Sequence, residues 1–281
     1  MKKLIINILS GIIVITLLAV FIVTLNKIKK QQNSQATLPL PTENFLQTQT
    51  PELTPSPAAP NESESPVSSD DDAPSEKPTT PPAAQDPFVN APAGYFEDAL
   101  FIGDSRTVGL SEYGNIEGAT FFATTGMSVY NITTEKVSVP GMGKTTFDTL
   151  MTSKKYGKIY VMLGINELGY KMSATVKKYG ELIKKIKSYQ PQAILFIEAN
   201  LHVSQSRSDS DPVFNNTNIN TLNQEISQFA DQKTVFYIDV NPLFDDENGN
   251  LAAKYTADNS HILGKYYSNW REWLCTKAVV L

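Results

Sequence analysis

Apolar and polar positions follow two alternating patterns from Tyr95 to the end of the chain. Short, continuous apolar runs are typical of strands that are covered on both faces of a sheet. Between these runs apolar residues recur at helical spacing, as in Ser173–Tyr189, where lysines fill the opposite face. We expect strands at Ala99–Ile102, Ala119–Thr124, Lys158–Leu163, Ala193–Ala199 and Thr234–Val240, and helices at Thr145–Lys154, Ser173–Tyr189, Asn218–Asp231 and Lys265–Ala278.

This alternation of strands and helices predicts an α/β fold for residues 95–281. Strands that alternate with helices form parallel sheets, because each helix carries the chain back across one face of the sheet. We therefore expect a three-layer α/β/α sandwich around a five-stranded parallel sheet.

The first 30 residues have a different pattern. Leu4–Leu25 holds no charged residue, and as a helix it would span roughly 33 Å, enough to cross a bilayer core of about 30 Å. The lysines that follow contain neither a small-residue cleavage pattern nor a cysteine for lipid attachment. We predict an uncleaved signal-anchor, a transmembrane helix within residues 1–30. Lysines flank both sides of it, so charge bias barely decides its orientation.

Residues 31–94 form a segment of low complexity, rich in Pro, Ser, Thr, Ala, Asp and Glu. Such a composition buries too little apolar surface to offset the entropy of ordering, which predicts a disordered linker. As a flexible coil it would average roughly 45 Å end to end. Linkers of this kind commonly hold a domain away from a membrane. We therefore expect a single-pass cell-membrane protein whose C-terminal domain is extracellular.

Composition narrows the possible partners. The net charge is −5 and the pI is about 5.2, without a basic cluster outside the N-terminal region, which disfavours a nucleic-acid partner. Cys275 is the only cysteine, so an intrachain disulfide and a cysteine-based zinc cluster are excluded. The sequence indicates no cofactor and no metal. The two histidines, His202 and His261, are the only candidates for a histidine base.

The strongest chemical candidate is Ser105, in the run Gly103-Asp104-Ser105 directly after the first expected strand. We expect a helix to begin there, with Ser105 near its N-cap. Open α/β sheets bind ligands at the carboxyl edge, and a helix N-terminus favours an anion. Ser105 is therefore either a nucleophile or an ordinary capping serine, depending on what the rest of the chain brings to that edge.

Other polar groups also follow strands. Asp258 precedes His261 by three residues in a loop before the last helix, a spacing that lets the carboxylate orient the imidazole. Gly126, after the second strand, offers an unobstructed N–H, and Asn166, after the third, offers a side-chain amide. With the Ser105 N–H these groups are candidates for an oxyanion hole. His202, after the fourth strand, is the alternative base.

The ordered set of Gly103-Asp104-Ser105, Gly126, Gly164-Ile165-Asn166-Glu167 and Asp258-Asn259-Ser260-His261 resembles the SGNH (GDSL) hydrolase family over essentially all of residues 95–281. The resemblance implies a flavodoxin-like sandwich and serine-dependent acyl-ester chemistry. It implies Ser105 as the nucleophile, His261 as the base and Asp258 as the group that orients it. The oxyanion hole would consist of Gly126, Asn166 and the Ser105 N–H.

Two positions depart from the family pattern: Arg106 replaces a leucine, and Glu167 replaces an aspartate. Arg106 either binds a carboxylate of the substrate or forms a salt bridge with Glu167 or Asp104. We take Arg106, Glu167 and His202 as candidate substrate-binding residues.

We expect a membrane-anchored extracellular serine esterase that cleaves O-acyl esters, O-acetyl groups above all, on small molecules or cell-surface glycans. Two alternatives remain open: an O-acetyltransferase with the same triad, and an inactive glycan-binding domain. The run from Gly141 to Thr146 resembles a phosphate-binding loop, but Ser138 occupies the position of the required first glycine. Nucleotide binding is therefore not expected.

Overall fold

The computed structural model describes residues 87–280. The expected membrane anchor and most of the expected linker lie outside the described residues. Within residues 87–280, no helix combines the length and the apolar character that a membrane crossing requires.

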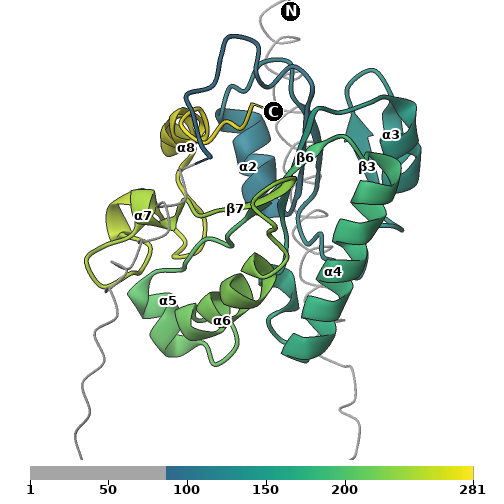
Figure 1. The fold of residues 1–281 in the computed structure, drawn as a ribbon. Coiled ribbons are helices and arrows are strands. Elements are labelled where there is room, and N and C mark those ends of the chain that lie inside the picture. Colours follow the sequence, from purple (N-terminus) through teal and green to yellow (C-terminus); the bar gives the residue numbers. More distant parts are fainter. Residues whose placement is uncertain (1–86, 281) are drawn as a thin grey trace, which may run out of the picture. The chain divides into compact units, whose positions relative to one another are not determined.

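A parallel sheet of five strands forms the centre of the fold (Figure 1). Its spatial order is β2-β1-β5-β6-β7, and every neighbouring pair is parallel. This confirms the expected α/β class and all five expected strands. The strands are β1 (Ala99–Gly103), β2 (Thr120–Ala123), β5 (Lys158–Met162), β6 (Ile194–Glu198) and β7 (Val235–Ile238).

Helices cover both faces of the sheet. Successive side chains along a central strand point to opposite faces, so they pack alternately into two apolar clusters. In β1, Leu100 and Ile102 pack into the cluster beneath α3, α4 and α6, whereas Phe101 packs into the cluster beneath α2 and α8. Burial on both faces explains why the strands are continuously apolar in sequence. The helices are α2 (Ser105–Tyr113), α3 (Phe147–Ser153), α4 (Met172–Tyr189), α6 (Asn216–Ser227) and α8 (Tyr267–Leu274).

The structure adds elements that the apolar pattern did not predict. An antiparallel hairpin, β3 (Lys136–Val139) and β4 (Gly143–Thr146), lies beside the main sheet, and the glycine-rich run that resembles a phosphate loop forms the end of its turn and all of β4. Two short helices, α5 (Gln205–Ser210) and α7 (Asn241–Phe244), follow β6 and β7. Single 3₁₀ turns lie at Ile165–Glu167, Ala253–Tyr255 and Gly264–Tyr266.

The folded region begins on the N-terminal side of the expected boundary at residue 95. The backbone of Val89 exchanges two hydrogen bonds with Ala278, and the Ala91 N–H donates to the Cys275 carbonyl. Residues that belong to the linker by composition thus pair with the C-terminal end of the chain.

Candidate active site

The turn from β1 to α2 carries Ser105 to the carboxyl edge of the sheet. Asp104 is the N-cap of α2, and its Oδ1 accepts a hydrogen bond from the Arg106 N–H at 2.9 Å. Ser105 is therefore the first residue of the helix rather than its cap. The backbone at the start of α2 directs unpaired N–H groups and the positive end of the helix dipole toward this position.

Ser105, His261 and Asp258 form one hydrogen-bonded relay. The Ser105 Oγ lies 2.8 Å from His261 Nε2, and His261 Nδ1 lies 2.7 Å from Asp258 Oδ2. The carboxylate can only accept, so His261 Nδ1 donates to it and leaves Nε2 free to accept the hydroxyl proton of Ser105. This is the arrangement of a nucleophile, a base and the group that orients the base.

The loop that carries Asp258 and His261 is fixed by its own hydrogen bonds. Asp258 Oδ1 accepts from the backbone N–H groups of Ser260 and His261. Partial burial acts to raise the pKa of Asp258, but these donors hold that pKa well below its usual range. Asn259 takes a left-handed conformation, with φ of 68°, and its side chain accepts from the Ser204 hydroxyl. Asp258 is therefore ionised and positioned before any substrate binds.

Gly126 and Asn166 line the same cleft as Ser105. Gly126 has a φ of +79°, a left-handed conformation that strains any residue with a Cβ. Asn166 follows Gly164, whose φ is +126°, and its Nδ2 donates to the Met127 carbonyl at 2.9 Å. One amide proton of Asn166 thus anchors the Gly126 loop, and the second remains available to an oxyanion. The expected oxyanion donors are therefore present on one cleft with Ser105.

Glu167 does not line the cleft, so the expected substrate contact is wrong. Its side chain is buried, and Oε1 accepts from the Val129 N–H at 2.6 Å. Burial raises its pKa to about 7. Glu167 thus acts with Asn166 in anchoring the loop that carries Gly126.

Arg106 lines the cleft next to Ser105, and only 3% of its surface is exposed. Its Nη2 donates to the Ser260 carbonyl at 3.2 Å, whereas its Nε is buried without a partner. Among the ion pairs of residues 87–280, none joins Arg106 to Glu167 or Asp104, which corrects the expected salt bridge.

His202 lies outside the residues that line the cleft and is 8% exposed. Its Nδ1 lies 2.8 Å from Asp245 Oδ2, and its Nε2 lies 2.8 Å from Asn220 Oδ1. Both ring nitrogens are therefore occupied. The expectation that His202 binds substrate, or serves as the alternative base, is wrong for this reason.

The cleft has a volume of about 390 Å³ and includes two residues that sequence reasoning missed, Arg207 and Phe214. Arg207 lies in α5, and Phe214 lies in the segment between α5 and α6. Because α5 buries no side chain, it has no apolar periodicity that could have predicted it. The only available signal was position, since both residues follow a strand at the carboxyl edge of the sheet.

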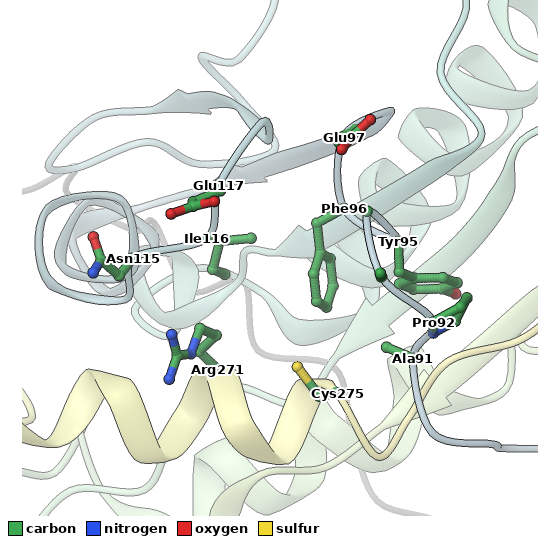
Figure 2. Close-up of a pocket in the computed structure, with 12 residues that line it drawn as sticks. Ala91, Pro92, Tyr95, Phe96, Glu97, Asn115, Ile116, Glu117, Arg271 and Cys275 are labelled. Carbon is green, nitrogen blue, oxygen red and sulfur yellow. The ribbon is translucent and has the colours of Figure 1, made fainter.

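A larger cavity, of about 450 Å³, lies at the opposite edge of the sheet (Figure 2). Arg271 of α8 and Cys275, the C-cap of that helix, face it from one side, and Phe96 and Glu117 face it from the segments before β1 and β2. Its lining holds no hydrogen-bonded pair of a nucleophile and a base. The candidate nucleophile and base therefore line the smaller cleft rather than this larger cavity.

Comparison with known proteins agrees with this geometry. The model of the GDSL-like Lipase/Acylhydrolase family matches residues 101–264, a segment that contains Ser105, Gly126, Asn166, Asp258 and His261. Comparison with curated sequences finds no match.

Similar solved structures include three bacterial and fungal proteins. A GDSL-like lipase from Bacteroides thetaiotaomicron has 15% identity and a TM-score of 0.49, and the match covers 66% of this chain and 89% of that one. An acetylxylan esterase from Geobacillus stearothermophilus, as a catalytic mutant, has 16% identity and a TM-score of 0.45, with 63% and 91% covered. A carbohydrate esterase family 3 protein from Talaromyces cellulolyticus has 13% identity and a TM-score of 0.41, with 62% and 92% covered.

The family model covers more than half of the chain and includes Ser105, Asp258 and His261. The family assignment rests on this match and not on the similar solved structures. The chain belongs to the GDSL-like lipase/acylhydrolase family, the SGNH hydrolases, and is an ester hydrolase.

Proposed function

We propose that this protein is a serine esterase that cleaves O-acyl esters through an acyl-enzyme on Ser105. The observation that carries the proposal is the relay of two short contacts, 2.8 Å from Ser105 Oγ to His261 Nε2 and 2.7 Å from His261 Nδ1 to Asp258. A hydroxyl held on an oriented imidazole loses its proton to that base as it attacks a carbonyl carbon.

In the first half of the reaction, Ser105 Oγ bonds to the acyl carbon and its proton passes to His261 Nε2. The resulting oxyanion accepts from the N–H groups of Ser105 and Gly126 and from the Asn166 amide; each such donor typically contributes about 3 kcal/mol in the transition state. The ester C–O bond then breaks, and His261 returns the proton to the leaving alcohol.

In the second half, water attacks the acyl carbon and gives a proton to His261 Nε2. The bond from Ser105 Oγ to the acyl carbon then breaks, His261 returns the proton to Ser105 Oγ, and the free acid leaves. The His261 side chain is 40% exposed, so solvent reaches the base. In the transferase alternative, a sugar hydroxyl replaces this water. Incubation with an acyl ester and an oligosaccharide acceptor separates the two, because a transferase forms acylated sugar and a hydrolase forms free acid.

The substrate that we propose is a short O-acyl group, acetyl above all, on a glycan. A cleft of about 390 Å³ lies at the small end of ligand sites and suits a short acyl group with part of its sugar. Tyr130 and Tyr170, on the loops that carry Gly126 and Asn166, stack at 4.9 Å between ring centroids. Both are exposed, 37% and 61%, and lie outside the residues that line the cleft, where their flat aromatic surfaces suit stacking against a sugar ring beyond the ester.

We also propose that the N-terminal segment anchors the enzyme in the cell membrane with the catalytic domain outside. The support is the apolar run Leu4–Leu25 followed by a long proline-rich segment. Protease treatment of intact cells tests this: an outward domain is cleaved without lysis, and an inward domain is protected.

The mechanism is tested with Ser105→Ala and the matched control Ser111→Ala, an exposed serine on the same helix. With 4-nitrophenyl acetate or butyrate, Ser105→Ala should lose kcat/KM by at least about 10⁴-fold. Ser111→Ala should retain it. Unchanged turnover in folded Ser105→Ala would contradict the proposal.

A further inference from the structure

Arg106 is a buried cation beside the nucleophile. It lies in the first turn of α2, directly after Ser105, and only 3% of its surface is exposed. Removing an ion from water is costly, so a buried guanidinium normally has a carboxylate partner. Arg106 nevertheless lines the cleft, so a ligand there lies against it.

The described part of the chain supplies no such partner. No ion pair within 4.0 Å joins Arg106 to a carboxylate among residues 87–280. Its side chain donates to the neutral carbonyl of Ser260, and its Nε is buried without a partner.

The two nearby carboxylates do not replace the missing partner. Asp104 is fully buried and burial raises its pKa, whereas the charge of Arg106 acts to lower it; the two residues form no ion pair within 4.0 Å. Asp258 is occupied by His261 and by backbone donors. The guanidinium of Arg106 is therefore left without a direct ion pair among residues 87–280.

A second guanidinium lines the same cleft. Arg207 reaches it from α5, with its Cζ 5.6 Å from the centre of the Phe214 ring. Its Nη2 forms an ion pair with Asp211 at 2.9 Å, but its Nε is buried without a partner. Two arginines on separate elements thus border the space in front of Ser105.

We propose that this cleft recognises an anionic group, a carboxylate or a phosphate, on the ester that Ser105 cleaves. Arg106 is the principal binding residue, and Arg207 assists it from the α5 side. A charge-assisted hydrogen bond to a guanidinium is about twice as strong as a neutral one, and it is strengthened where water is excluded. The substrate class is thus an acyl ester whose acyl or alcohol part carries a negative charge; the inference rests on the proposed esterase function.

Two matched pairs of esters test the proposal and locate the charge. For an anion on the alcohol part, 3-acetoxybenzoate is compared with its methyl ester. For an anion on the acyl part, the mono-4-nitrophenyl ester of adipic acid is compared with its methyl ester, because its carboxylate does not readily close a ring onto its own ester. We expect at least one anionic ester to have about 10-fold or more higher kcat/KM than its neutral partner. The pair that shows this preference identifies the side of the ester that faces Arg106.

The preference ratio is then measured in three variants. Arg106→Met should bring the anionic-to-neutral ratio to about one, and Arg207→Met should lower it several-fold. Arg271→Met is the matched control, because Arg271 lines the cavity at the opposite edge of the sheet, and it should leave the ratio unchanged. A general loss of activity in a variant lowers both rates together, so the ratio separates recognition from damage.

Binding provides a second readout that does not need turnover. In NMR titrations, the native protein should bind 3-hydroxybenzoate at least about 10-fold more tightly than its methyl ester. Arg106→Met should remove this difference in affinity. If the native enzyme hydrolyses neutral esters through Ser105 but shows ratios near one in both pairs, the inference fails and the proposed function stands. If the anion binds through Arg106 but Ser105 hydrolyses neither pair, the proposed function fails and the anion site stands.

Discussion

Two histidine–aspartate pairs lie past the carboxyl edge of the sheet, and their first contacts are almost the same. His261 Nδ1 is 2.7 Å from Asp258, and His202 Nδ1 is 2.8 Å from Asp245. Their second contacts differ, because His261 Nε2 meets the Ser105 hydroxyl, whereas His202 Nε2 meets the amide oxygen of Asn220. Their exposure also differs: the His261 side chain is 40% exposed and that of His202 is 10% exposed.

The comparison separates two oriented imidazoles by the partner of the second nitrogen: that of His261 faces a hydroxyl in a cleft, as the proposed base requires, and that of His202 does not. His202 has an oxygen acceptor at each ring nitrogen, so both nitrogens donate and the protonated ring is favoured. Burial acts to lower the pKa of His202, but the hydrogen bonds to Asp245 and Asn220 raise it overall. In the proposed mechanism the Asp258 pair serves the reaction, whereas we expect the Asp245 pair to stabilise the fold.

The largest expected effect separates the two histidines by activity. His261→Ala should lower kcat/KM for a 4-nitrophenyl ester by at least about 10⁴-fold, because no other group near Ser105 takes its proton. His202→Ala, measured per folded molecule, should stay within about 10-fold of the native enzyme. Steady-state kinetics on both variants, with circular dichroism for folding, checks this. Retained activity in His261→Ala together with its loss in folded His202→Ala would reverse the assignment.

The same contrast applies to the aspartates. Asp258→Asn should lower kcat/KM by about 10² to 10⁴-fold, since an amide no longer fixes the tautomer that leaves Nε2 free to accept. Asp245→Asn should keep most of its activity per folded molecule. Comparable losses in both variants, under the same kinetic assay, would show that the two pairs do not have separate roles.

For the free energy of unfolding, we expect Asp245→Asn to have the larger effect and Asp258→Asn the smaller one. Asp245→Asn leaves a buried histidine without its charge partner and should cost about 3 kcal/mol of unfolding free energy, measured by denaturant titration. Asp258→Asn changes a side chain that is 56% exposed and should cost less than about 1 kcal/mol.

The pH dependence gives the control for that stability difference. The folded pKa of His202 is raised, so the stabilisation by its protonated form is complete below the unfolded pKa, about 6.5, and is lost as the pH rises through the folded value. The stability gap between the native protein and Asp245→Asn should therefore shrink at alkaline pH. A gap that widens there is incompatible with a protonated His202.

Glu167 contrasts with His202, because it is a buried acid that has no basic partner. Its pKa is raised from 4.5 to about 7, so between these values the folded state retains a proton that the unfolded state has lost. Stability should thus fall as the pH rises through this range, by up to about 3 kcal/mol. Glu167→Gln keeps an acceptor for the Val129 N–H and should reduce this slope; part of it remains, because burial also raises the pKa of Glu198 to about 8. Unfolding curves from pH 4 to 8 test it, and an unchanged slope would assign the pH dependence to other groups.

The parts of the fold that apolar patterning predicts are those that bury an apolar face. All five strands and the long helix α4 have such faces and were expected, whereas α5, without a buried side chain, was not. The hairpin of β3 and β4 also escaped prediction. Its strands have four residues each, too short to show a clear alternation of apolar and polar residues. Its glycines also resemble the pattern of a phosphate-binding loop.

Sequence spacing likewise identified the Asp258–His261 pair, because its two members are three residues apart. It did not reveal Asp245 and Asn220 as partners of His202, since those contacts join residues 43 and 18 positions apart. For the same reason the unpaired state of Arg106 and the presence of Arg207 in the cleft required the three-dimensional structure.

Covalent labelling tests the central claim most directly. A fluorophosphonate probe should add one label to the native protein, mapped to Ser105 by peptide mass spectrometry. The label should be lost in His261→Ala and retained in His202→Ala, because only His261 activates the hydroxyl. Labelling at another residue, or equal labelling of Ser105 with and without His261, would contradict the account.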